Sequence, residues 1–100
     1  MILYAVELEM DIALRDEYMA WLRRHVRDML ALPGFAGAEI MARLEPPPPK
    51  GRFVVCAHYR LHDRAAWETY LTDYAPRMRE AGRRRFGDRV TAARWLLETA

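Results

Sequence analysis

The residues best suited to chemistry in this sequence are a histidine and three charged residues that strand alternation places on one face of a predicted sheet. His58 lies in a predicted strand, and Glu7, Glu39 and Arg94 lie in three others. A histidine beside a carboxylate can act as a general acid or base. Charged residues on neighbouring strands can instead form ion pairs that fix strand register. We therefore keep these four as candidate ligand-binding residues, with structural ion pairs as the alternative.

A second candidate site involves His25 and Tyr70, each on a predicted helix. His25 lies at the edge of an apolar stripe, where it could face Tyr70 or Tyr74 and contact a ligand. The alternative is a partly buried, hydrogen-bonded structural histidine. Buried phenol and indole groups need hydrogen-bond partners. The aromatic residues expected between helices and sheet therefore indicate either ordinary core packing or a pocket for a flat apolar ligand. They are Tyr4, Trp21, Tyr59, Trp67, Tyr70, Tyr74 and Trp95.

Composition excludes several chemistries. Serine, asparagine and glutamine are absent, so there is no serine nucleophile and no side-chain amide to bind a substrate. Cys56 is the single cysteine, which excludes an intramolecular disulfide and is typical of a reducing compartment. We expect a cytoplasmic protein with no metal site and no cofactor.

Charge and hydropathy limit the expected partners. The net charge is only +2, and the Arg83-Arg84-Arg85 run lies near a predicted helix end, where cations favour the helix dipole. We expect a solvated basic face or a dimer-edge contact rather than nucleic-acid binding. No apolar run approaches the roughly 20 residues of a membrane span, so we expect no membrane partner.

Hydrophobic periodicity predicts the elements that must position these residues. Period-two alternation or β-rich composition predicts strands over residues 2–9, 35–44, 52–61 and 89–98. Asp11 and Asp63 are candidate caps for two helices. Pro33-Gly34 should end the first helix, and Pro76 should break the second. This βαββαβ order predicts one ferredoxin-like α+β domain over residues 1–100.

The predicted sheet is four-stranded and antiparallel, with the first and third strands in the centre and both helices on one face. Alternation leaves the other face largely apolar, with no cover in a two-layer monomer. An apolar patch of this kind usually marks an interface. We therefore predict a homodimer joined through its sheet faces, mainly by Ala5, Val54, Cys56, Ala92 and Leu96. The residues assigned to this face are Leu3, Ala5, Glu7, Phe35, Glu39, Met41, Val54, Cys56, His58, Val90, Ala92, Arg94 and Leu96.

Motifs along nearly the whole chain resemble the dimeric α/β-barrel superfamily, in which two ferredoxin-like subunits join their sheets. They are ILYAVELE, EYMAWLRRHVRDML, LALPGFAGAEI, FVVCAHYRL and HDRAAWETYLTDYAPRMREAGRRRFGDR. The PGFAGAEI link and the YAPRMR block also resemble a bacterial family of unassigned function, related to antibiotic-biosynthesis-type monooxygenases. The resemblance is specific for fold and assembly and weak for activity.

The resemblance implies a small aromatic or apolar ligand, held between helices and sheet or inside the barrel. The superfamily includes cofactor-independent monooxygenases, haem-degrading enzymes and muconolactone-isomerase-like enzymes. The haem-degrading branch uses an asparagine, which this chain lacks. We expect a small-molecule binding or structural module. The alternative is a cofactor-independent monooxygenase or isomerase acting on a small aromatic or polyketide-like substrate, and the sequence leaves open whether the protein is an enzyme.

Overall fold

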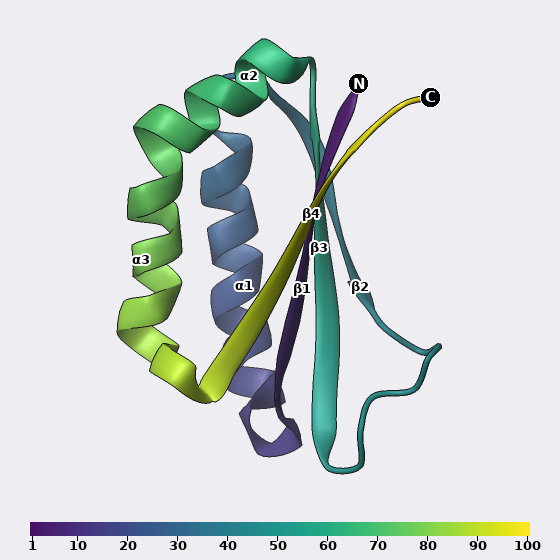
Figure 1. The fold of residues 1–100 in the computed structure, drawn as a ribbon. Helices are drawn as coiled ribbons and strands as arrows, with labels where there is room; N and C mark the ends of the chain where they lie inside the picture. Colours follow the sequence, from purple (N-terminus) through teal and green to yellow (C-terminus); the bar gives the residue numbers. More distant parts are fainter.

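The computed structural model describes all residues from Met1 to Ala100 and has the ferredoxin-like α+β order (Figure 1). The strands are β1 (Ile2–Asp11), β2 (Phe35–Ala42), β3 (Arg52–Leu61) and β4 (Val90–Glu98). The helices are α1 (Arg15–Leu30), α2 (Arg64–Thr69) and α3 (Ala75–Phe86). Short helical turns are η1 (Ile12–Leu14), η2 (Tyr70–Tyr74) and η3 (Gly87–Arg89). The predicted fold class is confirmed.

The four strands form one antiparallel sheet in the order β2-β3-β1-β4, as predicted. The central strands β1 and β3 pair along their full lengths, from Ile2 opposite Leu61 to Asp11 opposite Arg52. All the helices lie on one side of the sheet, and the opposite face has no helix over it (Figure 1). The core therefore fills the space between one sheet face and the helices.

The first helical segment begins and ends where local chemistry requires. The Asp11 carboxylate accepts a hydrogen bond from the backbone N–H of Ala13 at 2.8 Å, which caps η1 before α1. A three- and four-residue spacing turns one stripe of α1 into the core. Its buried members are Tyr18, Leu22, Val26 and Met29. The helix ends before Pro33, and Gly34 supplies the positive φ of 83° needed to enter β2.

The second helical segment is interrupted beside Pro76, as predicted. Asp63 caps α2 through a 2.8 Å hydrogen bond from the Ala66 N–H. Turn η2 is a π-helical turn in which the Ala75 N–H donates to the Tyr70 carbonyl oxygen. Proline has no N–H to continue an α-helical ladder, so the wider turn accommodates it. The extra residue changes the phase of the stripe, and Leu71, expected inside, is 39% exposed.

The side chains of β4 lie on the opposite faces from those predicted. Arg94 pairs with Val6 and therefore points to the helix side, whereas Trp95 pairs with Ala5 and lies on the uncovered face. The same correction moves Val90, Ala92 and Leu96 to the helix side and Ala93 and Leu97 to the uncovered face. Alternation separates two sets of residues, but it does not say which set faces inward. Both sets are apolar in β4, so only the pairing register decides.

Phe35 is also on the helix side, contrary to prediction. A bulge between Phe35 and Gly37 changes the alternation at the start of β2. The Phe35 ring consequently contacts Tyr59 and Tyr70, at centroid distances of 5.9 and 5.3 Å. A Cβ at Gly37 would overlap the Arg60 guanidinium, so a larger residue there would require the end of the Arg60 side chain to move.

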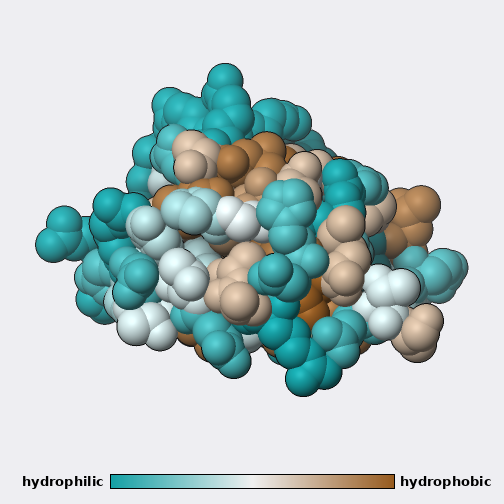
Figure 2. All heavy atoms as spheres, turned by 90° about the horizontal axis from the view of Figure 1, so that it is seen from above, coloured by the Kyte–Doolittle hydropathy of each residue, from teal (hydrophilic) through white to brown (hydrophobic).

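The uncovered sheet face retains exposed apolar side chains. Met41, Trp95 and Leu97 are 42%, 50% and 51% exposed, respectively. Seen from the end at which α2 lies, hydrophilic groups dominate the outline, but hydrophobic atoms also reach the surface on the side of this face (Figure 2). No helix of the chain combines the length and hydrophobicity needed to cross a membrane.

Candidate ligand-binding site

A cavity of about 350 Å³ lies between the helices and the sheet. Its walls come from β1, β3 and β4 on one side and from α1, η2 and α3 on the other. Most of its lining residues are hydrophobic, 14 of 20. Ligand-binding cavities are typically about 300–1,000 Å³ and mostly apolar, with a few placed polar groups. The size and lining are therefore those of a site for a small molecule.

Tyrosines from four elements converge on this cavity. Tyr4 and Tyr59 are directly opposed across β1 and β3, so both point to the helix side, with ring centroids 5.8 Å apart. Tyr18 comes from α1 and Tyr70 from η2. Burial raises the pKa of Tyr18, Tyr59 and Tyr70 above the ordinary phenol value. These hydroxyls therefore stay protonated at neutral pH and available as hydrogen-bond donors.

The hydroxyl groups of Tyr18 and Tyr59 are open to the cavity. Neither makes a hydrogen bond to another protein group, although the two residues are only 4% and 2% exposed. Every side-chain nitrogen or oxygen that is fully enclosed has a partner. The two hydroxyls must therefore border empty space, where a ligand or water can satisfy them.

His25 and Trp21 form one wall of the cavity as a stacked pair. Their ring centroids are 4.5 Å apart with an interplanar angle of 15°. On its α3 side, the Trp21 ring packs closely on Gly82, where a Cβ would lie 3.1 Å from Trp21 Cη2. Burial lowers the pKa of His25, an effect that the nearby Asp28 opposes. The imidazole is consequently neutral at neutral pH and able to accept a proton.

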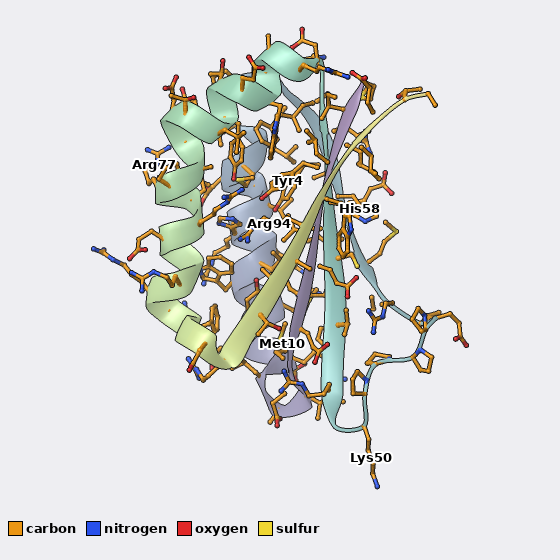
Figure 3. All side chains as sticks on the ribbon, in the orientation of Figure 1. Tyr4, Met10, Lys50, His58, Arg77 and Arg94 are labelled. Atoms are coloured by element: carbon orange, nitrogen blue, oxygen red, sulfur yellow. The ribbon has the colours of Figure 1, made fainter.

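Two arginines approach the Tyr4 hydroxyl from different sides of the cavity. Arg94 Nε of β4 donates to Tyr4 Oη at 3.0 Å, and Arg79 Nη2 of α3 donates to the same oxygen at 3.3 Å. Figure 3 shows Arg94 between β4 and the helices, below Tyr4. Neither guanidinium has a carboxylate within 4.0 Å, because neither takes part in any ion pair of the chain. Both side chains are solvent-accessible, which places them at the mouth of the cavity.

The structure divides the six predicted candidate residues into two groups. His25, Tyr70 and Arg94 line the cavity. Glu7, Glu39 and His58 lie on the uncovered sheet face, away from it. The prediction that Arg94 lies beside the other charged residues is wrong, because its strand pairs in the other phase.

The carboxylates of the uncovered face have arginine partners that we did not predict. Glu7 binds Arg43 and Glu39 binds Arg60, each with an N–O distance of 2.6 Å. His58 lies directly opposite Glu39 but makes no hydrogen bond or ion pair. Arg60 follows His58 by two residues and so shares its face, a signal in the sequence that would have identified this partner. Arg79 was also missed, since the π-turn alters the helix phase before it.

The remaining reactive side chains form no further centre. Histidine, cysteine, aspartate and glutamate side chains nowhere gather in groups of three that could hold a metal ion. Cys56 is half-buried on the uncovered face. Burial and the neighbouring Glu7 raise the pKa of its thiol, which disfavours the reactive thiolate.

Solved structures with this architecture include oxygenases. A candidate antibiotic biosynthesis monooxygenase from Deinococcus radiodurans superposes with a TM-score of 0.71 and 15% identity, covering 100% of this chain and 93% of that one. SnoaB, a cofactor-independent oxygenase from Streptomyces nogalater, gives 0.65 and 15%, covering 99% and 93%. The chain therefore has the ferredoxin-like fold of antibiotic biosynthesis monooxygenase-type proteins.

The chain belongs to the family described as "Domain of unknown function (DUF4286)", which matches residues 1–100. No curated protein matches it in sequence. A de novo designed protein, Foldit4, shares the fold with a TM-score of 0.66 and 8% identity, covering 99% of this chain and 98% of the design. The fold alone therefore does not identify an activity, and the function must be inferred from the residues of the site.

Proposed function

We propose that this protein binds a small aromatic or apolar molecule in the cavity between its helices and sheet. The observation that carries the proposal is the set of tyrosines around the cavity, two of whose hydroxyls have no protein partner. Flat aromatic walls favour a flat ligand, and free hydroxyls can orient it.

A purely structural role accounts less well for this arrangement. Protein interiors are close-packed, with few voids larger than a water molecule. A space of about 350 Å³ beside large aromatic side chains forgoes packing contacts that closure would supply. Its retention is explained if a ligand occupies it.

A cofactor-independent monooxygenase or isomerase is the second candidate, and His25 is the observation that favours it. Its neutral imidazole lies in the cavity wall, where it could remove a proton from a bound substrate. The SnoaB likeness supports this candidate at the level of the fold only. The readout is oxygen consumption or product formation with a bound aromatic substrate, lost in His25→Phe.

We also propose that the protein is a cytoplasmic homodimer. A lone cysteine suits a reducing compartment. The exposed Trp95 and Leu97 on the uncovered sheet face support pairing of two copies through that face. A dimer of this type leaves the helix-side cavity as a separate site in each protomer.

The binding proposal is tested with the neutral dye phenylnaphthylamine, whose fluorescence rises in apolar surroundings. We expect saturable binding to the wild-type protein and at least tenfold weaker binding to Ala92→Phe, whose new ring enters the cavity. Ala93→Phe, the same change on the opposite face of β4, is the control and should bind like wild type. No dye binding, or equal loss in both variants, would contradict the proposal.

A further inference from the structure

We propose that the ligand of this cavity carries a carboxylate, which the guanidinium groups of Arg79 and Arg94 bind at the cavity mouth. This inference rests on the proposed binding function and narrows it to planar aromatic acids. The observation that supports this inference is that two arginines without carboxylate partners both bind one phenol oxygen at the edge of an aromatic cavity.

The two arginines are brought together by the fold rather than by sequence proximity. Arg79 comes from α3 and Arg94 from β4, and both reach the Tyr4 hydroxyl, at 3.3 and 3.0 Å. Two like charges directed at one point repel each other, and an anion between them relieves that repulsion. The pair therefore has the charge arrangement of an anion site.

Most of the hydrogen-bonding capacity of this pair is unused. A guanidinium has five N–H donors, and each of these two uses one of them, on Tyr4. By contrast, the third arginine that lines the cavity, Arg83, is paired with Glu80 by two hydrogen bonds. Arg79 and Arg94 thus differ from their neighbour in having donors free for a ligand.

A carboxylate is the anion that best fits this geometry. Planar guanidinium groups bind carboxylates through paired, charge-assisted hydrogen bonds. The interior of the cavity is lined by Tyr4, Tyr18, Trp21 and Tyr59, which suit a flat ring system rather than a fully hydrated ion. A flat aromatic acid would place its rings inside and its carboxylate at the mouth.

The test compares naphthoate with naphthamide, a neutral molecule of nearly the same shape, by isothermal titration calorimetry on the full chain. We expect wild-type protein to bind naphthoate at least tenfold more tightly, as charge-assisted hydrogen bonds imply. Added salt should weaken only naphthoate binding. Arg94→Gln and Arg79→Gln should each reduce that preference at least threefold.

Arg84→Gln is the matched control, because Arg84 lies on α3 but does not line the cavity. It should leave the preference for naphthoate unchanged. Equal affinity for the two probes, or an equal effect of all three variants, overturns this inference while the binding function stands. Failure of both probes and of phenylnaphthylamine to bind overturns the binding function as well. Circular dichroism of each variant verifies that it is folded.

Discussion

Tyr4 connects most of the candidate site through a single side chain. Its ring packs against Trp67 and Tyr70, at centroid distances of 4.7 and 5.7 Å. Its hydroxyl oxygen accepts hydrogen bonds from Arg79 and Arg94 at the cavity mouth. The apolar part of the residue is thus fixed in the core and the polar tip is held at the cavity. Such a rigid, half-polar side chain positions charged groups at little entropic cost.

His25 provides a pH-dependent test of the cavity wall. Burial lowers its pKa in the folded protein below the value of about 6.5 expected in the unfolded chain. Above about pH 6.5 the imidazole is neutral in both states. As the pH falls below that value, the unfolded chain takes up the proton first, so the free energy of unfolding decreases. The contribution of His25 is therefore a loss of stability toward acid pH.

We expect His25→Phe to reduce the fall in the free energy of unfolding between about pH 7.5 and pH 5.5. Phenylalanine keeps a flat ring to stack on Trp21 but cannot take up a proton. The measurement is urea denaturation at a series of pH values. His62→Gln, which removes an exposed histidine before α2, is the control. An unchanged pH profile in His25→Phe would show that this residue does not titrate as its burial implies.

For individual residues, the sequence identified several members of the site correctly but did not predict which of them lie together. His25, Tyr70 and Arg94 were candidates and do line the cavity. Arg94 was nevertheless assigned to the other face, because alternation alone cannot orient a strand that is apolar on both sides. Arg79 could not be placed, since its position depends on a π-turn that no simple helical period describes.

Among the elements, the junction between α1 and β2 is the most constrained by backbone geometry. Gly34 has a φ of 83°, and a Cβ at this position would overlap the Cβ of Ala66 in α2. The residue therefore combines a left-handed conformation with close packing of two elements. Gly51 has a similar φ of 78°, but its surroundings are open.

We expect Gly34→Ala to destabilise the protein by about 2–4 kcal/mol, the sum of backbone strain and overpacking. Gly51→Ala should cost only about 1 kcal/mol, from the backbone term alone. For a domain of this size, each 1 kcal/mol corresponds to roughly 4–8 °C in Tm. Thermal denaturation followed by circular dichroism measures both. Equal losses in the two variants would show that the contact with Ala66 contributes nothing.

The elements themselves were largely predictable because each has its own local signal. The third strand was predicted over the residues that form β3, and Asp63 caps α2 as expected. The prediction did less well where an element depends on its neighbours. The bulge that turns Phe35 inward accompanies the close approach of Arg60 to Gly37 from the next strand, which local sequence does not reveal.

At the scale of the whole molecule, the uncovered sheet face has a charged half and an apolar half. Arg43, which follows β2, forms an ion pair with Glu7 of β1. Because β3 lies between β2 and β1, this ion pair crosses over β3, and Val54 of β3 is fully buried. Ala5, Trp95 and Leu97 occupy the other half, over β1 and β4. Of the five residues that we expected to form the dimer contact, Val54 is buried, and Ala92 and Leu96 lie on the helix side. We therefore now expect this contact to centre on Trp95 and Leu97, over β1 and β4.

This distribution predicts that Trp95 is central to the proposed dimer. We expect light scattering at micromolar concentration to give wild-type protein twice the chain mass of 11.7 kDa. Trp95→Glu should give the single-chain mass, because two buried and unpaired carboxylates would face each other across a symmetric interface.

Leu96→Glu is the matched control for this prediction. Leu96 is 43% exposed, against 50% for Trp95, but it lies on the helix side of the same strand. Its substitution adds the same charge to the same edge strand without entering the uncovered face, so this variant should remain dimeric. Wild-type protein at 11.7 kDa would show that the exposed apolar half has another partner or none, and monomers from both variants would show that β4 pairs through its edge.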